Sequence, residues 1–243
     1  MQATIDARHT MTRRLLDTLF PPRCVGCRTR GYWICPPCLA GIERLPLPLC
    51  GVCRDPVDPT GTAHGCRRGT GTPLTISAVG TYAGPLREAV HALKYKGRHG
   101  IGATLAELLA PCVAPLAQDG DLLIPIPLHP SRLRERGYNQ SAIVAAELAR
   151  LLPLELAPRA LRRDRRTADQ VTLSAAERVA NLRGAFSASL ETVRDRRVWL
   201  LDDVYTTGAT LGAATRALHD AGAGAGNVRA AVVAATLVDH RQG

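Results

Sequence analysis

Blocks of apolar residues alternate with mixed segments over the last two thirds of the chain. The run 198–201 follows a charged stretch and is typical of a strand buried on both faces of a parallel sheet. Similar runs predict strands over 76–82, 122–126 and 228–237. Leucine and alanine recur at helical spacing over 86–95, 102–117, 142–152 and 211–221. This alternation predicts an α/β fold, with a mostly parallel sheet flanked by helices.

The first third of the chain is instead rich in cysteine. Two Cys-x2-Cys pairs can supply the four thiolates of a tetrahedral zinc site. The simplest assignment gives Cys24, Cys27, Cys35 and Cys38 to a first structural zinc. A second set would hold Cys50, Cys53 and Cys66, with His64 as a candidate fourth ligand. The alternatives are redox-active cysteines and a second site that has lost its metal.

These patterns divide the chain into three parts: a leader over 1–20, expected to be a short amphipathic helix, a zinc module over 21–73 and an α/β domain over 74–243. No apolar run approaches the roughly 20 residues that a membrane-spanning helix needs. The leader is too short and too broken for an export signal. We therefore expect a cytoplasmic protein, in which cysteines bind metal rather than form disulfides.

The charge of the chain favours anionic partners. Its formal net charge is +10, almost all of it from arginine. The only lysines are Lys94 and Lys96, at the end of a predicted helix. They could form a cationic wall beside bound phosphates, or simply complement the helix C-terminus.

The strongest chemical signal follows the strand at 198–201. Asp202 and Asp203 stand at the expected carboxyl end of that strand, where α/β sheets bind ligands. A small hydroxyl-rich turn comes next and opens a helix, and backbone N–H groups at a helix N-terminus bind phosphate. Carboxylates accept hydrogen bonds from vicinal hydroxyls or help to hold Mg²⁺ through water. Together they indicate a pocket for ribose 5-phosphate.

This segment resembles the signature of type I phosphoribosyltransferases that binds 5-phosphoribosyl 1-diphosphate (PRPP). The resemblance implies that the turn holds the 5-phosphate and that the acid pair holds the ribose hydroxyls. It is carried by Asp202, Asp203, Val204, Tyr205, Thr206, Thr207, Gly208, Ala209 and Thr210. The structural alternative is a capped helix with two solvated aspartates. A Walker loop is excluded, because no Gly-Lys-Ser or Gly-Lys-Thr follows the turn.

A second resemblance covers 125–140, Pro-Ile-Pro-Leu-His-Pro-Ser-Arg-Leu-Arg-Glu-Arg-Gly-Tyr-Asn-Gln. It is similar to the signature of the ComF family, competence-associated proteins with a double zinc ribbon and a phosphoribosyltransferase-like domain. In that family this loop corresponds to the pyrophosphate loop, which implies roles for His129, Ser131 and Arg132. The proline-rich loop has few backbone donors, so these side chains would carry the binding.

A third segment, 162–186, resembles the region of the flexible loop that closes over the active site in this family. Its candidate residues are Arg165, Arg166, Thr167 and Gln170. A solvated arginine run is the alternative. Closure of a basic arm over an anion pocket would exclude water and strengthen charge contacts.

The sequence thus indicates a PRPP- and Mg²⁺-binding phosphoribosyltransferase, a glycosyltransferase of pentosyl groups, that transfers or senses a phosphoribosyl group. No residue is assigned as a general base, and no acceptor pocket is recognisable. The family resemblance implies a role in DNA uptake during natural competence. The alternative function is a non-catalytic component of the uptake machinery that binds single-stranded DNA or a nucleotide.

Overall fold

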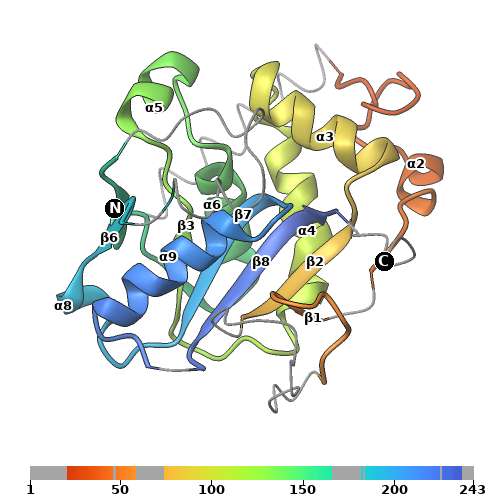
Figure 1. Ribbon diagram of the computed structural model, residues 1–243. Helices are drawn as coiled ribbons and strands as arrows, with labels where there is room; N and C mark the ends of the chain where they lie inside the picture. Colours follow the sequence, from red (N-terminus) through yellow and green to blue (C-terminus); the bar gives the residue numbers. More distant parts are fainter. Residues whose placement is uncertain are drawn as a thin grey trace, which may run out of the picture.

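A six-stranded sheet forms the centre of the molecule in the computed structural model, which describes residues 21–45, 48–58, 74–165, 182, 184–224 and 226–236 (Figure 1). Its strand order is β1-β2-β8-β7-β3-β4. Only β1 runs antiparallel to its neighbour, β2. The strands are β1 (Leu49–Cys50), β2 (Thr75–Thr81), β3 (Asp121–Pro125), β4 (Leu154–Leu156), β7 (Val198–Tyr205) and β8 (Val228–Ala235).

Helices cover both faces of this sheet, which confirms the α/β fold class. Helix α9 lies on one face, together with a separate two-stranded antiparallel sheet of β5 (Leu161–Arg163) and β6 (Phe186–Ala188). Helices α3, α4 and α6 pack on the other. The helices are α2 (Pro36–Ala40), α3 (Gly84–Tyr95), α4 (Ile101–Val113), α5 (Pro130–Arg136), α6 (Gln140–Leu151), α8 (Leu190–Val193) and α9 (Ala209–Asp220).

Alternating side chains of β7 divide between two apolar cores, one on each face. Val198 and Leu200 pack with α9, whereas Trp199 and Leu201 pack with α3, α4 and α6. The apolar run at 198–201 is therefore buried on both sides, as its composition predicts.

The zinc module and the α/β domain share the sheet. β1 contains Cys50, which pairs with Thr75 of β2. Further along the same edge, the backbone N–H of Thr81 donates to the carbonyl of Glu43 at 2.9 Å. The segment before residue 74 thus supplies the outermost strand of the sheet.

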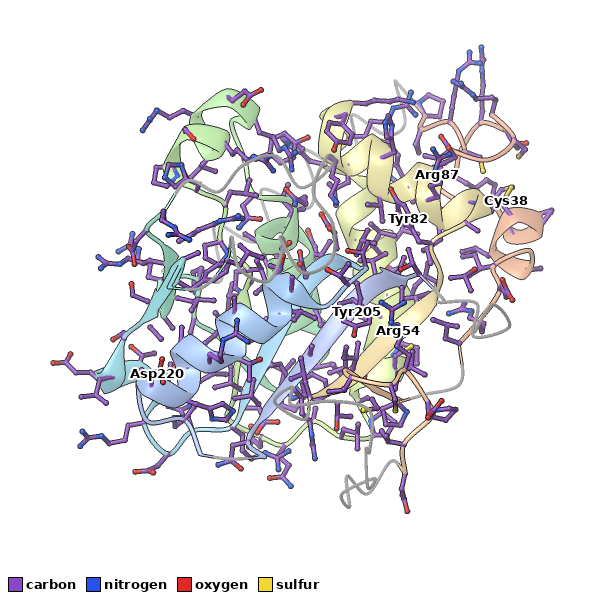
Figure 2. The ribbon with its side chains drawn as sticks, viewed as in Figure 1. Cys38, Arg54, Tyr82, Arg87, Tyr205 and Asp220 are labelled. Carbon is purple, nitrogen blue, oxygen red and sulfur yellow. The ribbon has the colours of Figure 1, made fainter. Side chains whose placement is uncertain are left out.

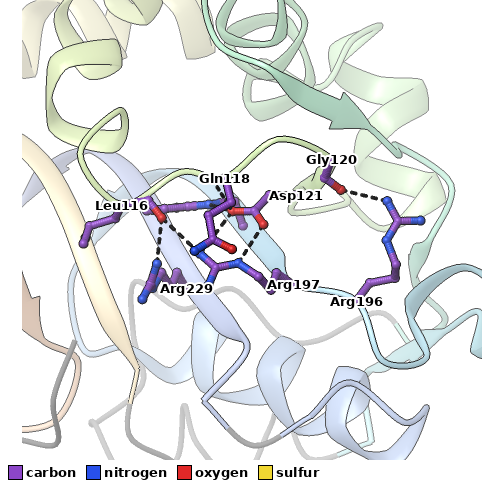
Figure 3. A network of polar contacts seen from close by, with 8 residues as sticks. Leu116, Gln118, Gly120, Asp121, Arg196, Arg197 and Arg229 are labelled. Carbon is purple, nitrogen blue, oxygen red and sulfur yellow. Dashed lines mark hydrogen bonds and ion pairs between the residues drawn. The ribbon is translucent and has the colours of Figure 1, made fainter. Parts of the chain in front are cut away.

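A polar network fixes the end of the sheet where β3 and β7 begin (Figure 3). The carboxylate of Asp121, 3% exposed, accepts from Arg197 Nε at 2.8 Å and from the indole of Trp199 at 3.0 Å. Arg197 and Arg229 also donate to the carbonyl of Leu116. These donors compensate the buried charge, so we assign the network a structural role.

Among the described residues, every helix is too short or too polar to cross a membrane.

Candidate functional site

The candidate site lies at the end of β7 that leads into α9. The strand continues through Tyr205, so Asp202 and Asp203 lie within its second half rather than beyond it. Because successive side chains of a strand point to opposite faces, the two carboxylates face different surroundings.

The turn after β7 has the geometry of a phosphate cradle. Gly208 adopts a left-handed conformation with φ of +78° and forms the N-cap of α9. A Cβ atom here would lie 3.0 Å from the ring of Tyr205, so glycine is required on two counts. Gly208 has no side chain to cap α9, and Thr207 Oγ1 accepts from the N–H of Ala209 at 3.4 Å. The following N–H groups of the first turn can serve a ligand.

A shallow hollow opens over this turn. Its empty space is about 210 Å³ and is partly open to solvent. The lining combines the strand end, the turn and the first residues of the helix: Asp202, Val204, Tyr205, Thr206, Thr207, Gly208, Ala209, Thr210 and Leu211.

Asp202 faces the hollow. Its Oδ1 accepts from Ser141 Oγ at 3.3 Å and from the backbone N–H of Asp203 at 2.9 Å. Burial, and then the negative charge of Asp203, raise the pKa of the Asp202 carboxyl to about 7. The positive charge of Lys94 only partly offsets this rise. Near neutral pH, Asp202 therefore exchanges between an acceptor-only carboxylate and a protonated acid.

Asp203 does not line the hollow. It is 4% exposed, its Oδ1 lies 2.8 Å from Lys94 Nζ, and its Oδ2 accepts from Gln140 Nε2 at 2.7 Å. Burial works to lower the pKa of Lys94, but the charge of Asp203 and its hydrogen bond outweigh burial and raise that pKa. Lys94 is thus a cation held by Asp203, an arrangement that neither alternative for the lysines anticipated.

The Gly-Tyr-Asn-Gln-Ser segment supplies hydrogen-bond partners for the acid pair that the sequence did not predict. Asn139 caps α6 by accepting from the N–H of Ser141 at 3.0 Å. Gln140 and Ser141, both buried, also bind the two aspartates. The sequence clue to this role is that two polar residues directly follow the helix cap, at the start of a helix that packs into the core.

The three candidate pyrophosphate residues begin helix α5, which the proline-rich sequence did not suggest. Pro130 occupies the first helical turn, where a missing N–H costs nothing. The Nδ1 atom of His129 lies 2.8 Å from Ser131 Oγ and accepts from the N–H of Ser131 at 3.2 Å. His129 and Ser131 therefore form one local unit.

The flexible-loop candidates fall mostly outside the described residues, with Arg166, Thr167 and Gln170 among those not described. Arg165 is exposed just beyond β5. Arg163, two residues earlier, lies closer to the site. Burial, and then the nearby charge of Arg132, lower the pKa of the Arg163 guanidinium, whereas the negative charge of Asp202 raises that pKa. Arg163 is thus within electrostatic range of both Arg132 and Asp202, and the two neighbouring guanidinium groups make a locally basic wall that an anion would stabilise.

The first cysteine set has the geometry of a structural zinc site. The Sγ atoms of Cys24, Cys27, Cys35 and Cys38 all lie within 4.8 Å of one another. A hydrogen bond from Thr29 lowers the pKa of Cys27 to about 6, while burial and the neighbouring sulfurs raise the pKa of Cys38 to about 12. Four clustered thiolates need a cation, and these side chains would hold Zn²⁺ as structural ligands.

The second cysteine turn repeats the backbone of the first. In each, the arginine after the pair has a left-handed φ, +68° at Arg28 and +64° at Arg54. Its N–H donates to the carbonyl of the first cysteine, Cys24 or Cys50, at 2.9 Å. Cys50 and Cys53 are buried, and the other two candidate ligands, Cys66 and His64, lie outside the described residues.

Comparison with known families matches both halves of the chain. A family model described as a phosphoribosyl transferase domain matches residues 138–243, which include β7, the turn and α9. A second family model, described as a double zinc ribbon domain, matches residues 15–68. The zinc module and the sheet thus each correspond to a known domain type.

Curated relatives extend over most of the chain. The chain is 31% identical over 212 residues to competence protein F of Haemophilus influenzae, which covers 82% of this chain and 92% of that protein. It is 34% identical over 217 residues to the DNA utilization protein YhgH of Escherichia coli, covering 84% and 94%. A protein of the same name from Shigella flexneri is also 34% identical, over 203 residues, covering 79% and 88%.

Proposed function

The chain belongs to the ComF family, which joins a double zinc ribbon to a phosphoribosyltransferase domain, and from this we propose that it binds PRPP and transfers or senses a phosphoribosyl group. The observation that carries the proposal is the hollow shared by Asp202 and the turn 206–210. It places a hydroxyl acceptor beside a phosphate cradle.

In this proposal the 5-phosphate binds the N–H groups and hydroxyls of the turn, at the positive end of the α9 dipole. Asp202 accepts hydrogen bonds from the ribose hydroxyls in its ionised form. Asp203, although next in sequence, keeps Lys94 in place beside the site. This assignment follows the different surroundings of the two acids.

The pyrophosphate of the ligand, with Mg²⁺, lies against His129, Ser131 and Arg132. Arg163 adds a second guanidinium to this wall. Reaction at C1 of the ribose proceeds through an oxocarbenium-like transition state. The protein contributes by positioning the ligand and by stabilising the charge on the departing pyrophosphate.

The biological setting follows from the relatives, which are named for competence and DNA utilization. We place the activity in DNA uptake or in the use of the incoming DNA. The clustered thiols of Cys24, Cys27, Cys35 and Cys38 suit metal binding, which a reducing compartment favours, and we therefore propose a cytoplasmic location.

The test is calorimetric titration of the full chain with three ligands: Mg-PRPP, ribose 5-phosphate and inorganic phosphate. Asp202→Asn should weaken the binding of the two sugar ligands by roughly tenfold or more, because charge-assisted hydrogen bonds to the ribose hydroxyls are lost. It should leave phosphate binding equal or stronger. Asp119→Asn, in an exposed loop position, is the control. Absence of Mg-PRPP binding by the wild type would end the proposal.

A second candidate function, binding of single-stranded DNA, is favoured by one surface feature. Tyr95 is 65% exposed, its ring lies 5.3 Å from the guanidinium of Arg136, and Lys96 is adjacent. Exposed aromatic rings beside cations stack nucleobases. Affinity for an oligonucleotide should then fall steeply with salt and drop for Tyr95→Ala; a flat salt response argues against this function.

A further inference from the structure

The side chain of Arg54 extends from the second cysteine turn to the candidate phosphate turn (Figure 2). Its Nη1 donates to the carbonyl of Thr236 at 2.8 Å, and its Nη2 donates to the carbonyl of Thr206. The guanidinium carbon lies 5.2 Å from the centre of the Tyr205 ring. A single cation of the zinc module thus contacts the first residue of the turn and the strand end beside it.

Tyr205 makes the reciprocal contact. Its hydroxyl donates to the carbonyl of Gly51, inside the second cysteine turn, at 2.8 Å. The ring is 3% exposed and packs against Gly208. The cysteine turn and the phosphate turn therefore hold each other through contacts in both directions.

Arg28 shows that the cysteine turn itself does not require these contacts. It occupies the matching position of the first cysteine turn, with the same backbone conformation and the same N–H bond to the first cysteine. Its side chain, however, is exposed. The contacts of Arg54 are therefore a particular property of the second turn, and they are directed at the candidate site.

The bond to the Thr206 carbonyl has a geometric consequence. In a trans peptide the C=O and the following N–H point in opposite directions. Fixing the carbonyl of Thr206 toward Arg54 therefore fixes the N–H of Thr207 away from it, and Thr207 lines the hollow. Arg54 is absent from that lining, so it acts on the turn rather than on a ligand.

We propose that Arg54 is a positioning residue of the phosphate turn, through which the second cysteine turn sets the affinity of the site for phosphorylated ribose. This rests on the proposed function. By reciprocity of linked equilibria, a ligand in the turn also stabilises the cysteine turn that holds Arg54. The zinc module then acts as part of the binding site and not only as a separate stabilising unit.

The test compares Arg54→Ala and Arg54→Lys with the matched control Arg28→Ala in the full chain. Zinc content and thermal midpoint are measured first, so that a ribbon that has lost its metal is recognised. Two readouts follow: the Kd for Mg-PRPP, and hydrogen exchange of the amides of 206–210 without ligand. We expect Arg54→Ala to bind roughly tenfold more weakly, with faster exchange in the turn. Arg54→Lys should fall between it and the wild type, and Arg28→Ala should match the wild type.

Two results would overturn the proposal. One is an Arg54→Ala protein with wild-type Kd and wild-type exchange, even if its thermal midpoint falls, since this indicates a merely structural role. The other is an equal loss in Arg28→Ala. If the wild type itself does not bind Mg-PRPP, the proposed function fails, and the exchange readout alone decides: unaltered exchange refutes the positioning role, and faster exchange upholds it.

Discussion

Replacing Asp202 with asparagine should stabilise the ligand-free protein at pH 8 much more than at pH 5.5. The Asp202 carboxyl has a pKa of about 7 in the folded protein, against an ordinary value of 3.8. Because the folded protein favours the protonated acid, Asp202 contributes its full stabilisation below pH 3.8. This stabilisation is lost as the pH rises through 7. Asparagine keeps an acceptor for Ser141 and for the N–H of Asp203 and does not titrate.

The magnitude follows from the two pKa values. Between pH 5.5 and pH 8, the wild type loses up to about 2 kcal/mol of stability through ionisation of Asp202, and the variant loses none of it. Because Asp202 is only half-buried, solvent screening makes this figure an upper bound. A loss of folding stability caused by an ionised, half-buried acid is typical of a residue that is retained for function.

The assay is urea unfolding at the two pH values, followed by the intrinsic fluorescence of the two tryptophans, of which Trp199 is 1% exposed. Asp119→Asn is the control and should follow the wild type at both pH values. The reasoning is refuted if Asp202→Asn and the wild type show the same pH dependence. It is refuted equally if the variant gains stability at pH 5.5 alone.

Lys94→Met should destabilise the protein by about 3 kcal/mol in urea unfolding, because Asp203 would stay buried without its counter-charge. Lys96→Met, at an exposed position, is the control. Equal stability of the two variants would contradict the buried ion pair. Cys27→Ser should reduce bound zinc by about one ion per chain, measured by elemental analysis, because a hydroxyl replaces one of four thiolates. Cys112→Ser, whose thiol donates to Leu108 in α4, should keep the wild-type zinc content, and a loss there would count against the assignment.

The sequence predicted the central elements because their signals are local. The apolar run at 198–201, the turn and the alanine-rich helix each depend on neighbours within a few residues, and the structure has β7 and α9 in those places. Their ends differ by a few residues, since α9 begins at Ala209 rather than at 211.

The surroundings of the acid pair could not be read in this way. Gln140 lies 63 positions from Asp203 in sequence, and Lys94 is farther still. Only the packing of α3 and α6 against the same face of the sheet brings them to the same carboxylate. Helix α5 was missed for a different reason: a proline that disfavours a helix interior is well placed in its first turn.

The contribution of the zinc module to the outer edge of the sheet bears on how the chain can be divided. Glu43 and Arg44 lie against Gly80 and Thr81, and β1 pairs with Thr75 and Ile76, so β2 has a partner at both ends of its outer side. A fragment that starts at residue 74 would expose that row of backbone groups, and such edges pair with other chains. A shortened phosphoribosyltransferase domain is therefore expected to self-associate, and biochemical work on this protein should keep both parts in one polypeptide.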